Sequence, residues 1–293
     1  MNSEQSTAAK VFMTTDISAE GLEAIYLASG AQPSGKIAVK LHTGESPASN
    51  FLRPELIGSL VGGLGATIVE CNTAYGGSRG DTASHQRLVE AHGFTSIAKV
   101  DILDGEGDMS IPVTGGKHLQ ENFVGQNFPA YDYYIVLSHF KGHLMGGFGG
   151  ALKNTSIGLA SSMGKSWIHS AGKQKSGFGL DTKQEDFLES MAEAASSVID
   201  YLDGRMLFIN VMNRISVDCD CMAQPTEPDM HDIGILASLD PVALDQACVD
   251  LIYAAEDGAS VVERIESRKG LVTLEHAEEI GIGSRQYELV SID

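Results

Sequence analysis

The segment from Ser138 to Asn154 carries the densest set of residues that could do chemistry. His139, Lys141 and His143 alternate, so in extended chain they would project to one face. Two imidazoles at this spacing can chelate a metal or act as an acid and base pair, and an ammonium can neutralise a carboxylate or form a covalent adduct. We predict that these three residues are catalytic. The alternative is one buried, hydrogen-bonded His beside surface residues.

Glycines crowd the same segment, with five between positions 142 and 150. They let the backbone come close to a ligand. A helix that opens near Ala151 would add free N–H groups and its positive dipole end, and Lys153 would add a mobile cation. The spacing matches neither the Walker A loop nor the Rossmann fingerprint, so no nucleotide is predicted. The predicted binding residues of this segment are Gly146, Gly147, Gly149, Gly150, Lys153 and Asn154.

Two further segments add basic and polar groups to the predicted site. Lys40 and His42 would share one face of an expected strand. Asn72 and Arg79 belong to a glycine-rich loop, and a guanidinium binds a carboxylate or phosphate bidentately. These four residues are also predicted to bind the ligand, which we expect to be an anionic small molecule.

The motif Asp218-Cys219-Asp220-Cys221 is the candidate metal site. In a strand the two thiols would share a face, and paired thiols suit a soft metal ion. Two thiols are half of a four-ligand site, so a further ligand is needed. The predicted ligands of a divalent or soft metal ion are Cys219, Cys221 and His143, and Cys71 is another candidate. A redox-active dithiol and buried structural cysteines are the alternatives.

Short apolar or β-branched runs recur along the chain, and helical stretches often follow them. Strands are expected at 36–42, 66–71, 97–104, 133–139, 206–212 and 232–238, and helices at 54–64, 82–92, 186–203 and 240–255. This alternation favours an α/β fold with a mostly parallel or mixed sheet flanked by helices. We predict one domain over 1–293, with lobes at about 1–130 and 131–293 as the alternative. Ligands of such sheets gather outside the carboxyl ends of the strands, where most of the candidate residues fall.

Composition limits the choice of partner. The 293 residues include 39 acidic and 20 basic side chains, a formal charge of −19, which disfavours binding to nucleic acid or to an anionic membrane surface. No apolar run is long enough to span a bilayer. Four cysteines are too few for a disulfide scaffold. We expect a cytoplasmic protein in a reducing compartment, and a homo-oligomer is compatible with the sequence.

Several long motifs resemble a known family. KIAVKLHTGE, CNTAYGGSRG, SHFKGHLMGGFGGALKN and DIGILASLDPVALDQA occur in this order. They are similar to the bacterial and archaeal iron–sulfur-centre proteins called domain of unknown function 362, and the resemblance covers nearly the whole chain. Many relatives carry a ferredoxin-like insert with CxxCxxC runs, but residues 171–184 contain no cysteine. The resemblance therefore implies no [4Fe–4S] cluster of that type here.

Three functions are compatible with these observations. The first is an enzyme or cofactor-binding protein that acts on an anionic small molecule at the ends of the strands. The second is a redox or electron-transfer accessory that uses Cys219 and Cys221. The third is a non-catalytic binding module whose glycine loop serves packing alone.

Overall fold

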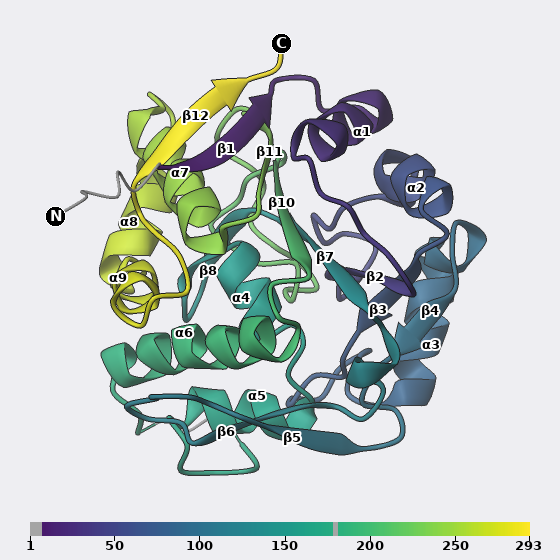
Figure 1. Cartoon of the computed structure of the whole chain (residues 1–293), viewed down its shortest axis with the longest axis vertical. Helices are drawn as coiled ribbons and strands as arrows, with labels where there is room; N and C mark the ends of the chain where they lie inside the picture. The colour runs from purple at the N-terminus through teal and green to yellow at the C-terminus, as the bar shows by residue number, and fades with distance from the viewer. Residues whose placement is uncertain (1–7, 178–180) are drawn as a thin grey trace, which may run out of the picture.

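A mixed sheet of eight strands forms the centre of the molecule (Figure 1), in the order β12-β1-β11-β10-β7-β2-β3-β4. The computed structural model describes residues 8–177 and 181–293. Strand β11 is antiparallel to both neighbours, and the other pairs are parallel, so seven strands point the same way. The predicted α/β fold with a mostly parallel or mixed sheet is confirmed. The strands of this sheet are β1 (Ala9–Thr14), β2 (Ile37–Lys40), β3 (Thr67–Glu70), β4 (Val100–Ile102), β7 (Tyr133–His139), β10 (Met206–Met212), β11 (Gly234–Ser238) and β12 (Tyr287–Ser291).

Two short antiparallel pairs lie outside this sheet. One joins β5 (Asp108–Pro112) to β6 (Glu121–Gly125), and the other joins β8 (Lys141–His143) to β9 (Gly147–Gly149). The second pair follows β7 after one residue, so it extends the chain beyond the carboxyl end of that strand.

Helices cover both faces of the sheet. In Figure 1, α1 and α2 lie on one side of the strand row, and α4, α6 and α7 lie on the other. The helices are α1 (Ala19–Ala28), α2 (Pro54–Gly63), α3 (Thr82–Ala91), α4 (Ala151–Ser156), α5 (Ser162–His169), α6 (Gln184–Tyr201), α7 (Pro241–Ala254), α8 (Ala259–Ser267) and α9 (Val272–Glu279), with 3-10 turns at η1 (Phe94–Ser96) and η2 (Phe128–Ala130). Among the described residues, no helix is both long and apolar enough to cross a membrane.

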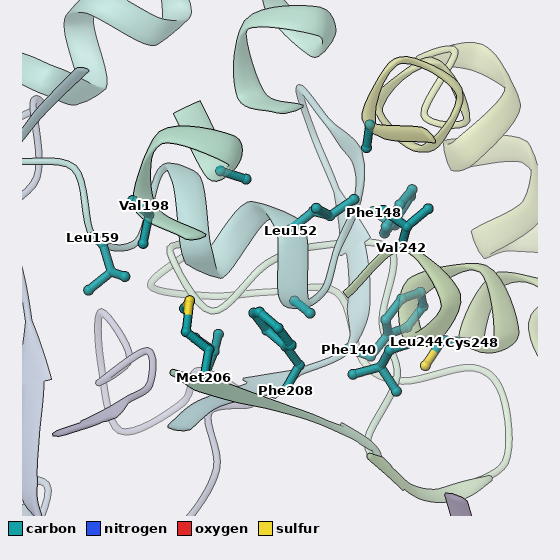
Figure 2. Close-up of a cluster of buried hydrophobic side chains, with 14 of the residues drawn as sticks. Phe140, Phe148, Leu152, Leu159, Val198, Met206, Phe208, Val242, Leu244 and Cys248 are labelled. Carbon is teal, nitrogen blue, oxygen red and sulfur yellow. The ribbon is translucent and has the colours of Figure 1, made fainter. Parts of the chain in front are cut away.

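Alternation along the central strands separates two hydrophobic cores. In β7, Tyr134 and Val136 belong to the core under α4, α6 and α7, whereas Ile135 and Leu137 belong to the core under α1 and α2. A strand that is buried on both faces can be apolar at every position, and this is why β7 is a continuous hydrophobic run. Figure 2 shows part of the first core, where Phe208 lies among side chains from several helices.

Most predicted elements are present with small differences at their ends. Strands β7 and β10 begin and end where the sequence predicts, and α7 begins at Pro241 after the N-cap Asp240. Strands β1 and β12 were not predicted. The single domain, with lobes 1–130 and 131–293 as the alternative, stays a prediction. So does the absence of a cluster in 171–184, of which residues 178–180 lie outside the described residues.

Candidate functional site

A cavity of about 310 Å³ lies at the carboxyl ends of β2, β3 and β7. Lys40, Glu70 and His139 end these strands and line the cavity. Parallel strands bring their carboxyl ends to one edge of a sheet, and the polar residues that follow each strand therefore meet there. The five cationic side chains that line the cavity are those of Lys40, Arg79, Lys141, Lys153 and Lys165.

Buried ion pairs hold the first two cations. Lys40 Nζ lies 2.9 Å from Glu70 Oε1, and Arg79 lies 3.0 Å from Glu45 and 3.5 Å from Glu70. Burial by itself would raise the pKa of Glu70, but Lys40 and the nearby basic groups hold this pKa well below its usual range. Arg79 thus pairs with carboxylates of the protein itself, and its predicted role in binding a ligand stays a prediction.

Asp220 is fully buried and holds two of the predicted catalytic residues. It accepts hydrogen bonds from His139 Nδ1 at 3.0 Å and from Lys141 Nζ at 2.8 Å. The second ring nitrogen of His139 donates to the carbonyl of Asn213 at 2.7 Å. His139 and Lys141 keep the pKa of Asp220 well below normal, although burial opposes this shift. Both ring nitrogens of His139 are therefore engaged within the protein, and its catalytic role stays a prediction.

Two other histidines in the cavity wall are held as neutral rings. His42 Nδ1 accepts the N–H of Gly44, and His143 Nδ1 accepts the N–H groups of Met145 and Gly146. Burial, followed by nearby cations, lowers the pKa of both rings well below 6.5. A neutral ring that accepts at Nδ1 carries its proton at Nε2. Each Nε2–H group is then a donor that has no acceptor among the described residues.

Lys153 differs from the other cations of the wall because no described residue pairs with its amine. Burial, and then the charges of Lys141 and Lys40, lower the pKa of Lys153 to about 7. At neutral pH a substantial fraction of this amine is therefore unprotonated. Such an amine can act as a base or a nucleophile.

The structure corrects the prediction of a ligand-binding anion site at the start of α4. The N–H groups of Ala151 and Leu152 donate to the carboxylate of Asp245, at 2.7 Å and 2.9 Å. Burial raises the pKa of Asp245 to about 6. The anion at this helix end is a side chain of α7, so the N–H groups are not free for a ligand.

The glycines of 142–150 have separate roles. A Cβ at Gly150 would lie 2.3 Å from Asp245 Oδ1, and one at Gly147 would lie 2.8 Å from the backbone of Gly270. Gly149 and Gly150 line the cavity, whereas Gly146 and Gly147 are absent from its wall. Contrary to the sequence prediction, Gly146 and Gly147 are therefore not placed to bind a ligand in the cavity. They allow the chain to pack closely.

The two predicted amides also separate. Asn154 lines the cavity, and its Oδ1 accepts a hydrogen bond from Lys40 Nζ at 2.9 Å. Asn72 does not line it: its side chain bonds to Thr82 and His85 beneath the wall. Asn72 supports the loop and is not placed to contact a ligand in the cavity.

The cysteine motif lies in a turn and not in the expected strand, and Cys219 and Cys221 form a disulfide bond. Cys221 lines the cavity, and candidate ligand atoms of His143, Cys219 and Cys221 all lie within 4.8 Å of one another. The two aspartates of the motif face different partners, because Asp218 lies 3.6 Å from Arg264 while Asp220 is buried at the cavity. Cys71 is buried and free.

Sequence reasoning missed several residues of the wall. Glu70, Lys165 and His169 were not singled out. A charged residue inside the apolar run ATIVEC marks Glu70, and the i,i+4 spacing of Lys165 and His169 places both on one face of α5. Nδ1 of His169 donates to the carbonyl of Lys165, and burial lowers the pKa of this ring to about 4.

The chain is an α/β protein with a cavity lined by basic side chains at the carboxyl edge of a largely parallel sheet. The chain belongs to the family described as domain of unknown function DUF362, whose model matches residues 37–250. The predicted family is confirmed. Family and cavity are consistent with a protein that binds a small molecule or cofactor.

Two solved structures are similar to this chain at low sequence identity. The lactate racemase apoprotein from Thermoanaerobacterium thermosaccharolyticum is 14% identical, with a TM-score of 0.41 over 71% of this chain and 51% of that chain. A protein from Thermotoga maritima is 11% identical, with a TM-score of 0.45 over 89% of this chain and 58% of that chain. The chain thus spans just over half the length of each. No curated protein matches.

Proposed function

We propose that this protein binds a small anionic molecule in the cavity at the strand ends and acts on it as an enzyme. The supporting observation is the local charge. Five lysine and arginine side chains line the cavity, and three buried carboxylates, those of Glu45, Glu70 and Asp220, pair with three of them. The remaining positive charge lies inside a chain of formal charge −19, where the average surface would repel an anion.

The donors in the wall suit a carboxylate or a phosphate. Nε2–H of His42 and Nε2–H of His143 have no described acceptor, and the amine of Lys153 has no described partner. A buried anion needs several hydrogen-bond donors to replace its hydration, and these groups supply them. The same groups give the chemistry of the site: two fixed donors and one amine that titrates near neutral pH.

Calorimetry with a panel of small carboxylates and phosphates tests this proposal. We expect at least one of them to bind, and Lys153→Met to weaken that binding by about tenfold because one charge-assisted hydrogen bond is lost. Lys99→Met is the matched control, since Lys99 is exposed and lies outside the wall. Equal losses in both variants, or no binding by the wild type, would reject the site. Binding without any conversion of the bound anion would favour the alternative that the protein is a non-catalytic binding module.

A second candidate function rests on the cysteine pair. Cys219 and Cys221 are bonded to each other beside His143, and Cys221 faces the cavity. Reduction would free two thiols, which with one imidazole make the Cys₂His set that catalytic zinc sites use. His143 is the weakest of the three ligands, because its Nδ1 accepts two backbone N–H groups and Nε2 must lose its proton to coordinate.

Cobalt(II) added to reduced and to oxidised protein tests this second function. We expect thiolate-to-cobalt charge-transfer absorption only after reduction, and its loss in Cys221→Ser. His143→Gln is expected to lower the affinity and keep the absorption. Cys248→Ala serves as the control, because Cys248 is buried in α7 away from the motif. If the reduced protein lacks this absorption, the metal site is excluded. Thiol titration would then show whether Cys219 and Cys221 still cycle between dithiol and disulfide.

A further inference from the structure

Among the lysines and arginines of the cavity wall, Lys153 is the one whose amine has no partner among the described residues. Each of the other four cations donates to a protein acceptor: Lys40 to Glu70, Arg79 to Glu45, Lys141 to Asp220 and Lys165 to the carbonyl of Ala160. A side chain that donates to a protein acceptor is already engaged and is less available to a bound molecule. Lys141, which the sequence offered as a site for a covalent adduct, is one of these paired lysines, because its amine donates to the buried carboxylate of Asp220.

The position of Lys153 is set by short-range geometry. The lysine lies in the first turn of α4, and Asp245 fixes that turn by accepting the N–H groups of Ala151 and Leu152. Its Cδ lies 3.5 Å from the position a Cβ would take at Gly149, so the chain passes close to the hairpin of β8 and β9. The stem of the side chain is thus confined while its amine stands at the cavity wall.

The surroundings of the amine favour its neutral form. Burial and the charges of Lys141, Lys40 and Arg79 all lower its pKa, which falls to about 7, and Glu70 opposes them weakly. Desolvation and neighbouring cations are the two means by which proteins make a lysine nucleophilic at neutral pH. A neutral amine in a site that binds anions is suited to one reaction above others: addition to a carbonyl group carried by the anion.

We propose that Nζ of Lys153 forms an imine with the carbonyl carbon of the bound molecule, and that the substrate is an anion carrying a ketone or aldehyde, such as a 2-oxo acid. The inference rests on the proposed anion site. The nitrogen lone pair adds to the carbonyl carbon and gives a carbinolamine. The carbinolamine then loses water, so that the amine's two hydrogens leave with the carbonyl oxygen and a C=N bond remains. No oxidant or reductant is consumed.

Reductive trapping tests the imine directly. The full chain is incubated with pyruvate and cyanoborohydride, and intact mass and peptide mapping locate the product. We expect a mass increase equal to pyruvate less one oxygen atom, located on Lys153. Lys153→Arg keeps the positive charge and should reduce labelling by at least about tenfold, because a guanidinium is not a nucleophile at this pH. Lys99→Met should be labelled like the wild type.

Acetate separates the imine from anion binding, because it carries the carboxylate and lacks the ketone. If acetate protects the protein from trapping and the label is confined to Lys153, both anion binding and imine formation are supported. Calorimetric binding of pyruvate without trapping would overturn the imine and leave the anion site standing. Labelling spread over surface lysines, or retained in Lys153→Arg, would overturn the assignment to Lys153.

Discussion

At the scale of single residues, the site depends on which charges are paired. The buried carboxylates of Glu70 and Asp220 pair with Lys40 and Lys141, and removing one partner would leave an uncompensated buried charge. Lys153 has no such partner among the described residues, and its lowered pKa is the consequence. The free energy of unfolding is therefore lower at the pH values where this amine is charged.

Lys153→Met should stabilise the fold in a pH-dependent way. The folded-state pKa is about 7 and the ordinary value is 10.5, so between these values the unfolded chain binds more protons and stability rises with pH. Below pH 7 the native state carries the full cost of the charge. Methionine has no charge, and we expect it to raise the free energy of unfolding by roughly 2 kcal/mol at acidic pH and by less as the pH approaches 10.

Urea unfolding at pH 6 and at pH 9.5 measures this difference. Lys99→Met removes an exposed lysine and should change little at either pH. A gain from Lys153→Met that is equal at both values would mean that the amine of Lys153 titrates as an ordinary lysine, and the chemistry assigned to it would lose its basis.

At the scale of elements, α4 is the piece that positions the amine. This helix has six residues, too few to be stable alone, and its orientation comes from packing and from Asp245. Ala151 and Leu152 belong to the first hydrophobic core, and Figure 2 shows Leu152 there, while Lys153 lines the cavity. The buried carboxylate of α7 thus links the core to the site.

Asp245→Asn should disturb this element. The carboxylate accepts from Ala151, Leu152 and Asn210, and an amide would direct an N–H group at one of these donors. We expect a loss of about 2 kcal/mol in the free energy of unfolding at pH 8 and weaker anion binding. Glu256→Gln is an exposed control with the same chemical change. Unchanged stability and affinity in Asp245→Asn would show that α4 is held by packing alone.

The strands differ in how well the local sequence pattern predicts them. Strands β7 and β10 are apolar at nearly every position, and the sequence predicts both with their bounds. Strand β12 lies at the edge of the sheet with partly or fully exposed side chains, so its residues give no hydrophobic run to detect. The turn at Cys219 was expected to be extended, because a Cys-x-Cys alternation resembles a strand and nothing local reveals that Asp220 must reach His139.

At the scale of the whole molecule, a basic cavity lies inside an acidic protein. The formal charge of −19 acts over long distances and is screened by salt, whereas the ion pairs at the cavity are buried and screened much less. For the proposed anion site, we therefore expect a small dianion to be repelled as it approaches and attracted once it enters.

This contrast gives a prediction for the rate of binding. The association rate of a dianion should rise several-fold when the salt concentration is raised from about 10 mM to about 150 mM, because the repulsion is screened. Stopped-flow measurements at both concentrations check it, with an uncharged ligand of similar size expected to show no change. A rate that falls with salt would mean that a basic surface steers the anion and that the charge is not distributed as inferred.

Local periodicity along neighbouring residues was enough to determine the α/β class, the central strands and the rule that polar residues gather at the strand ends. It also indicated Lys40, His42, Lys141, His143 and Lys153 as members of one site. Tertiary structure alone decided which of these groups are paired within the protein. Pairing, burial and hydrogen bonding depend on residues far apart in the chain, as with Asp220 and His139 or Asp245 and Ala151, and free energies of ionisation follow from those neighbours and not from the order of the sequence.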